Sequence, residues 1–101
     1  MRASGIDMIA AERARQKMPV EAGGEGYDLD HDLGHADELA VAATCYAMPA
    51  DARFMRSPGY PLDWPWGIAY WKPTPNNRIR ELVKAGAMIA AAIDAELEEI
   101  G

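Results

Sequence analysis

The sequence has little cysteine, little positive charge and no long hydrophobic run, and each shortage excludes a class of protein. A single cysteine, Cys45, among 101 residues rules out an internal disulfide and suits a reducing compartment. The formal charge of -6 argues against non-specific binding to DNA or RNA, which requires a basic surface that releases counterions from phosphates. No apolar run approaches the roughly 20 residues of a membrane span, and the polar first residues do not resemble a signal peptide. We therefore expect a cytoplasmic protein that does not bind membranes.

Patterns typical of several enzyme classes are also missing. The sequence has no G-x-S-x-G elbow and no glycine-rich phosphate loop, and Cys45 lies within an apolar helical segment. At this length we expect one domain, residues 1–101, with a modest core. A second copy of the chain would help to cover its apolar surface, so a homo-oligomer is expected.

Hydrophobic spacing predicts three helices, of which the first two are short. The first extends from about Gly5 to Met18, because Ser4 followed by Asp7 is typical of a capping pair and Pro19 ends the pattern. An acidic, glycine-rich loop follows to about Leu33, with Tyr27 as its anchor. The second helix begins with Asp32 as its cap and ends at Met48.

The first helix has a weak apolar side, and its polar residues allow two interpretations. Glu12 and Gln16 can belong to a solvated face on which Glu12 pairs with a neighbour such as Arg15. Alternatively, Glu12 and Gln16 point inward at a polar site.

The last quarter of the chain has the longest apolar pattern at helical spacing. Asn76 or Asn77 is a suitable cap for this third helix. We expect the rest of the chain to pack on a single apolar stripe of the helix. The stripe consists of Ile79, Leu82, Val83, Gly86, Ile89, Ala90, Ile93, Leu97 and Ile100.

Residues 49–77 form a long connection between the second and third helices, with most of the prolines and all three tryptophans. A structureless loop of this length is unusual in so small a domain, so its rings are expected either to dock on the helices or to form a functional surface. The predicted fold class is therefore all-α, a small three-helix domain with a long aromatic and proline-rich loop between helices 2 and 3.

The rings of this loop, Tyr70 among them, and the cations near the start of the third helix suggest a nucleotide pocket. Flat rings stack on bases, and a helix N-terminus with nearby cations receives phosphate. The structural alternative is that the rings complete a core that the short helices cannot form by themselves. The candidate ligand-binding residues are Tyr60, Trp64, Trp66, Trp71, Lys72, Arg78, Arg80 and Lys84.

A second candidate site is a metal centre. His31 and His35 are four residues apart in an acidic segment, and helix carboxylates including Glu81 could converge on a divalent cation. The alternative is that these acids complement the dipole at a helix N-terminus and that one histidine is a hydrogen-bonding strut. The nucleotide-pocket interpretation needs no cofactor, whereas the metal-centre interpretation requires magnesium or manganese. The candidate metal ligands are Glu12, His31, His35, Glu38 and Asp94.

Six motifs together resemble a family of small proteins encoded by tailed phages and prophages. They are A-E-R-x-R-Q from Ala11, E-G-Y-x-x-x-H-D-x-x-H from Glu25, E-L-A-x-A-A-x-x-Y-A from Glu38, W-P-W from Trp64, W-K-P from Trp71 and R-x-L-V-K-A-G-A-x-I-x-A-x-I-D from Arg80. The resemblance spans nearly the whole chain. It implies a phage or prophage origin and a place in the host-cell cytoplasm, and it assigns no catalytic residue.

A weaker likeness, at the level of the fold, is to all-α nucleotide pyrophosphohydrolases of the MazG type, which hold magnesium between helices. Here the acids of the second helix are only Asp37 and Glu38, which departs from the paired carboxylate motifs of that family. The leading hypothesis is a non-enzymatic phage protein that binds a nucleotide-like ligand or host factor, as an anti-defence protein that sequesters a host immune signal would. The alternatives are a metal-dependent nucleoside triphosphate pyrophosphohydrolase and an acidic protein that inhibits a host enzyme.

Overall fold

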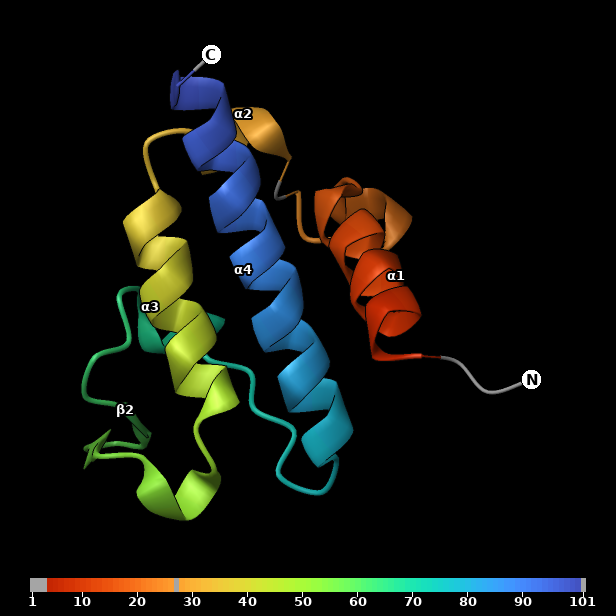
Figure 1. Cartoon of the computed structure of the whole chain (residues 1–101). Coiled ribbons are helices and arrows are strands. Elements are labelled where there is room, and N and C mark those ends of the chain that lie inside the picture. The colour runs from red at the N-terminus through yellow and green to blue at the C-terminus, as the bar shows by residue number, and fades with distance from the viewer. Residues whose placement is uncertain (1–3, 27, 101) are drawn as a thin grey trace.

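The computed structural model describes residues 4–26 and 28–100 and has an all-α fold with three main helices. The helix α4 (Arg78–Ile100) lies between α3 (Ala36–Ala47) and α1 (Gly5–Lys17), and only α3 runs antiparallel to it (Figure 1). The predicted all-α class, with a long loop between the second and third main helices, is confirmed. The shorter elements are η1 (Val20–Ala22), α2 (Leu29–Asp32), η2 (Ala50–Ala52), β1 (Met55–Arg56), β2 (Tyr60–Pro61) and η3 (Ile68–Tyr70).

Side-chain caps mark the start of α1 and of α4 as the sequence predicts. The Ser4 hydroxyl accepts a hydrogen bond from the backbone N–H of Asp7 at 3.1 Å. The Asn77 side-chain oxygen accepts one from the N–H of Arg80 at 3.1 Å. Each cap satisfies a backbone donor that has no partner within its helix.

The segment between α1 and α3 differs from the prediction. It contains the short helix α2, whose cap is Asp28, with a side chain that accepts from the N–H of His31 at 3.0 Å. Asp32, the predicted cap of the second helix, is fully buried in an ion pair with Arg13 instead. The anchor proposed for this loop, Tyr27, lies outside the described residues.

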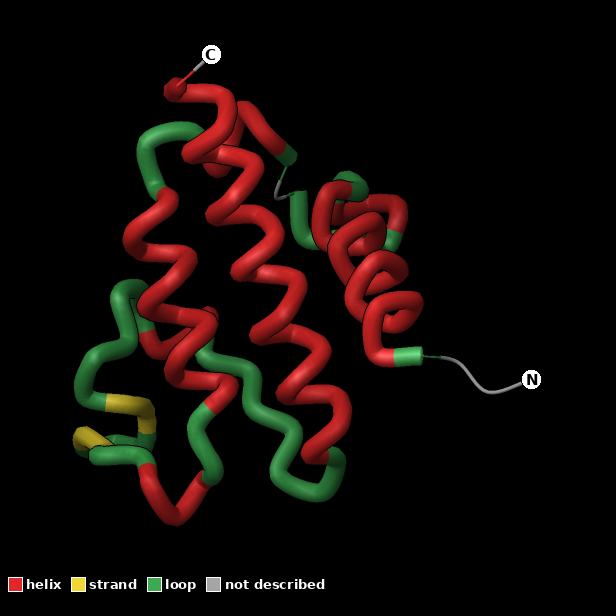
Figure 2. The backbone as a smooth tube through the Cα atoms, viewed as in Figure 1, coloured by secondary structure: helices red, strands yellow, loops and turns green. Residues whose placement is uncertain are grey.

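The long connection between α3 and α4 is folded in short pieces rather than as one extended loop. Its two strands of two residues each pair antiparallel, with Met55 opposite Pro61 and Arg56 opposite Tyr60 (Figure 2). Trp64 and Trp71 lie further along the connection and are buried with residues of α3 and α4. The connection is therefore held to the helices by its rings.

Small side chains form most of the contact between α3 and α4. The buried face of α3 includes Ala42 and Ala43, and that of α4 includes Ala85, Ala91 and Ala95. Alanines let two helix backbones approach closely, and such an approach leaves little room for larger residues between them.

The expectation that the large aliphatic residues of α4 form the core is wrong. Val83 is buried, but the other large members of the stripe are 46–82% exposed. The physical reason is that α3 presents mainly alanine, so the small residues of α4 pack against it and the branched residues remain outside. The exposed members are Ile79, Leu82, Ile89, Ile93, Leu97 and Ile100.

The helix α1 docks on the rest of the molecule with its polar face. Glu12, Arg13 and Gln16 are buried, whereas Ile6 is 81% exposed. The inward interpretation of Glu12 and Gln16 is therefore the one that the structure has. An apolar contact supports the docking, because the site where Gly86 lacks a Cβ is filled by the side chain of Ile9.

Within residues 4–26 and 28–100, no helix combines the length and the apolarity that crossing a membrane requires.

Candidate functional site

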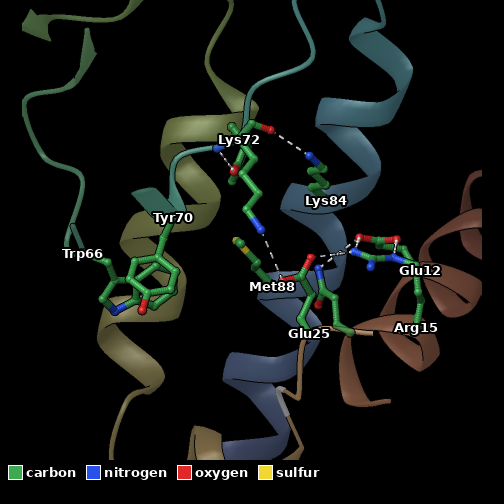
Figure 3. A pocket seen from close by; sticks show the side chains of 10 residues that line it. Glu12, Arg15, Glu25, Trp66, Tyr70, Lys72, Lys84 and Met88 are labelled. Atoms are coloured by element: carbon green, nitrogen blue, oxygen red, sulfur yellow. Dashed lines mark hydrogen bonds and ion pairs between the residues drawn. The ribbon is translucent and has the colours of Figure 1, made fainter. Parts of the chain in front are cut away.

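An open cleft of about 840 Å³ lies between α1, the turn after it, α3 and the aromatic loop. Beside it is a recess of about 30 Å³, large enough only for a water-sized group. Figure 3 shows the recess, with the rings of the aromatic loop on the α3 side and the charged residues of α1 on the other. The charged and aromatic residues that line the cleft are Arg15, Glu25, His31, Trp66, Tyr70 and Lys72.

The aromatic wall of the cleft consists of Trp66 and Tyr70. The indole N–H of Trp66 donates to Glu38 Oε2 at 2.9 Å, and its ring meets that of Trp64 edge-on at 5.3 Å. The bond from Trp66 lowers the pKa of Glu38. Tyr70 ends the short turn η3 and is 57% exposed. One ring is thus held in place and the other is open to solvent.

The charged wall consists of two cations with a carboxylate between them. Glu25 lies 3.3 Å from Arg15 Nη2 and 3.7 Å from Lys72 Nζ (Figure 3). The turn that carries Glu25 includes Gly23 and Gly26, both at positive φ, which an L side chain rarely adopts. The backbone therefore brings an acid between two cations that are 57 residues apart in the chain.

In the recess beside the cleft, hydrogen bonds within the protein hold Glu12 and Lys84 in place. Glu12 Oε1 accepts from Arg80 at 2.7 Å and from Arg15 at 2.9 Å. Burial acts to raise the pKa of Glu12, but the hydrogen bonds from Arg15 and Arg80 outweigh it, so the pKa is lowered and the carboxylate stays charged.

Lys84 donates from Nζ to the Lys72 carbonyl oxygen at 2.7 Å, and its ammonium lies 5.5 Å from the centre of the Tyr46 ring. Burial, followed by the charge of Arg80, lowers its pKa. Lys84 lines the recess rather than the open cleft. It can meet only the end of a ligand that reaches this depth.

Of the candidate ligand-binding rings, the structure places only Trp66 at the cleft. Trp64 and Trp71 are 6% and 9% exposed, and Trp71 stacks on Tyr46 at 4.7 Å. Tyr60 is half-buried and packs on the same cluster. These three rings complete the core, as the alternative interpretation of the aromatic loop has it.

Among the candidate phosphate-binding cations, Lys72 lines the cleft, whereas Arg78 and Arg80 are engaged elsewhere. Arg78 donates to the Tyr46 carbonyl at 2.8 Å, to the Met48 carbonyl at 3.2 Å and to the Ala47 carbonyl. These are the carbonyl groups that end α3, so Arg78 acts as its C-terminal cap. Arg80 binds the buried carboxylate of Glu12.

The five candidate metal ligands do not gather at one place. His31 Nδ1 lies 3.0 Å from Asp32, and His35 Nδ1 lies 3.4 Å from Glu38. Asp94 lies 4.0 Å from the Arg13 guanidinium, and the carboxylate of Glu12 binds two arginines. In the described part of the chain, no three His, Cys, Asp or Glu side chains are arranged to hold a metal ion.

Sequence reasoning missed Arg15 and Glu25 as cleft residues. It counted Tyr70 among the rings that suggest a pocket but not among the ligand-binding residues. The sequence does contain a feature that could have identified Glu25, because this acid stands among glycines in a turn soon after a predicted helix. Arg15 had no such feature, since an arginine one turn from a glutamate is also typical of a solvated helix face.

No protein-family model matches this chain, and no curated protein and no solved structure matches it either.

Proposed function

We propose that this protein binds a small anionic ligand with a flat ring, such as a nucleotide, and does not transform it. The observation that supports this most is the open cleft in which Trp66 and Tyr70 face the cations Arg15 and Lys72. Its volume of about 840 Å³ is within the range of small-molecule sites.

The two walls would recognise different parts of such a ligand. A base stacked on the exposed ring of Tyr70 would gain roughly 1–3 kcal/mol, in the range measured for base–aromatic contacts. The guanidinium of Arg15 and the ammonium of Lys72 would bind phosphate oxygens, which are strong acceptors of charge-assisted hydrogen bonds.

Glu25 lies where the proposal places the phosphate of the ligand. Its carboxylate already contacts both cations, at 3.3 and 3.7 Å. A ligand anion would have to displace it, so the affinity is the difference between two sets of ion pairs. We therefore expect Glu25→Gln to bind the ligand several-fold more tightly than the native chain.

The resemblance to phage and prophage proteins supports a specific biological form of this proposal. A phage protein that binds a nucleotide signal of its host without cleaving it would blunt the response that the signal triggers. The anionic ligand would then be a host immune nucleotide, and the role of the protein would be sequestration in the host cytoplasm.

Isothermal titration calorimetry with AMP, ATP and a cyclic dinucleotide tests the proposal. We expect binding by the intact chain and at least tenfold weaker binding by Tyr70→Ala and by Lys72→Ala, since tenfold corresponds to about 1.4 kcal/mol. The matched controls are Phe54→Ala and Lys17→Ala, which alter exposed residues that do not line the cleft. Absence of heat with all three probes, or equal losses in the controls, would contradict the proposal.

A product analysis separates binding from hydrolysis. After incubation with ATP and magnesium or manganese, the proposal predicts that the nucleotide is recovered intact. Release of diphosphate would instead support the pyrophosphohydrolase alternative.

A further inference from the structure

Four large aliphatic side chains form an exposed line along α4. Leu82, Ile89, Ile93 and Ile100 are 46%, 46%, 53% and 82% exposed. They are separated by seven, four and seven residues, so they lie along one side of the helix. Ile79 and Leu97 extend this face at one edge. A contiguous apolar surface of this kind on a small protein marks an interaction site.

This surface is separate from the cleft. Lys84, which lines the recess beside the cleft, follows Leu82 by two residues and therefore lies about 200° around the helix from it. The cleft and the exposed line thus use opposite sides of α4. The inference that follows does not depend on the proposed ligand.

We propose that this face of α4 is the interface of an antiparallel homodimer. The spacing of seven, four and seven reads the same in both directions. When two copies of α4 run antiparallel about a two-fold axis at the level of residue 91, Leu82 lies opposite Ile100 of the partner subunit and Ile89 lies opposite Ile93 of the partner subunit. A two-fold interface requires a surface that complements itself in this way.

The charges of α4 favour the same arrangement. The first part of the helix carries cations at 78, 80 and 84, and the last part carries acids at 94, 96, 98 and 99. This order opposes the helix dipole, which favours acids at the N-terminus and cations at the C-terminus, so it does not stabilise an isolated helix. In an antiparallel pair the basic end of each α4, where Arg78 lies one turn before Leu82, is beside the acidic end of the other, where Glu96 lies one turn before Ile100. A parallel pair would place acids against acids.

The basic end retains charge that a partner could meet. Arg78 lies one turn before Leu82 on the same side of α4, and although it is bonded within the chain, its side chain is 38% exposed. Glu81, the acid in this part of α4, is buried in ion pairs with Arg53 and Arg78. The exposed charge at the start of the helix is therefore basic. A second copy of the chain supplies both the matching apolar line and the matching acids, which makes it the occupant that this face fits.

Sedimentation equilibrium across the micromolar range tests the dimer. The intact chain should have twice the mass of one chain, and Ile89→Asp and Ile93→Asp should have the mass of one chain with an unchanged helical circular dichroism spectrum. Phe54→Asp is the control, because Phe54 is 79% exposed in the long loop, and this variant should remain a dimer. A monomeric intact chain, or dimeric variants at both 89 and 93, would overturn the proposal.

Disulfide trapping tests the direction without relying on destabilising charges. A mixture of Leu82→Cys and Ile100→Cys proteins should form a mixed disulfide under copper–phenanthroline oxidation faster than either protein crosslinks to itself. Burial raises the pKa of the native Cys45 thiol, so Cys45 should not compete. If Leu82→Cys crosslinks to itself at least as fast as the mixture, the antiparallel arrangement is overturned.

Discussion

At the scale of single residues, we expect the largest loss in the free energy of unfolding when the ion pair between Arg13 and Asp32 is broken. Asp32 is fully buried, and its carboxylate lies 2.8 Å from the Arg13 guanidinium. Removing one partner of a buried pair leaves the other charge uncompensated, at a cost of about 3–5 kcal/mol. We therefore expect Asp32→Ala to lower the free energy of unfolding by about that amount in urea denaturation.

Asp94 provides the matched control for this prediction. Its carboxylate lies 4.0 Å from the same guanidinium, but the side chain is 48% exposed, so Asp94→Ala should cost less than about 1 kcal/mol. Similar losses in the two variants would show that burial does not decide the strength of these pairs.

The three tryptophans show that residue type alone does not predict which rings are buried and which line the cleft. Trp64, Trp66 and Trp71 stand close together in the chain with similar neighbours, yet two are core residues and one lines the cleft. The difference arises from Tyr46, which packs on Trp64 and Trp71 and covers their rings. Because that contact joins segments about 20 residues apart, no local pattern in the sequence reveals it.

At the scale of elements, the end of α3 depends on arginines from outside the helix. Arg78 donates to carbonyls at the end of α3, and Arg53 donates to the Cys45 carbonyl at 2.8 Å. The last carbonyl groups of a helix have no partner within it, so these bonds replace water. The predicted role of Arg78 in phosphate binding and its role as a cap have different consequences.

We expect Arg78→Ala to destabilise the protein by about 1–3 kcal/mol, because hydrogen bonds from a charged group are lost. Amide hydrogen exchange should increase most in the last turn of α3, and nucleotide affinity should not change. Arg56→Ala alters an arginine of the strand β1 and is the control. Loss of nucleotide binding in Arg78→Ala with unaltered stability would favour the original phosphate assignment.

The helices themselves could be predicted from sequence better than their buried faces. The caps at Ser4 and Asn77 were correct because capping is a local interaction. The predicted buried face of α4 is wrong because the prediction assigned the core to the largest aliphatic residues. Which face of α4 is buried depends on the alanines of α3 and on the polar face of α1, and these are properties of the neighbours.

At the scale of the whole molecule, buried carboxylates link α4 to α1 and to the long connection, and they make stability depend on pH. Glu12 joins α1 to Arg80 of α4, and Glu81 of α4 binds Arg53 and accepts from the Thr74 N–H. Burial acts to raise the pKa of both acids, but the hydrogen bonds from arginine dominate and lower it.

An acid whose pKa is lower in the folded state contributes stability that is complete above its ordinary pKa and is lost as the pH falls through the lowered pKa. We therefore expect the urea midpoint of the native chain to fall on going from about pH 6 to about pH 3. The difference in stability between the native chain and Glu81→Gln should shrink over the same interval. The exposed Glu21→Gln is the control, and a native–variant difference for Glu81→Gln that is constant with pH would contradict the assignment.

The molecule has two distinct candidate binding surfaces on opposite sides of α4. One is the cleft, and the other is the exposed aliphatic line of α4. Composition predicted the kinds of contact, since rings, cations and an unusually apolar helix are visible in the sequence. Composition did not predict which charged residues meet at the cleft, because the contact among Arg15, Glu25 and Lys72 joins three separate segments of the chain.

The indole signals of the three tryptophans in a ¹H–¹⁵N correlation spectrum report separately on the cleft and on the core. On titration with AMP or a cyclic dinucleotide, we expect the Trp66 indole signal to shift progressively, while the signals of Trp64 and Trp71 stay nearly fixed. If none of the three signals moves with any nucleotide, or if those of Trp64 and Trp71 move most, the cleft is not the ligand site.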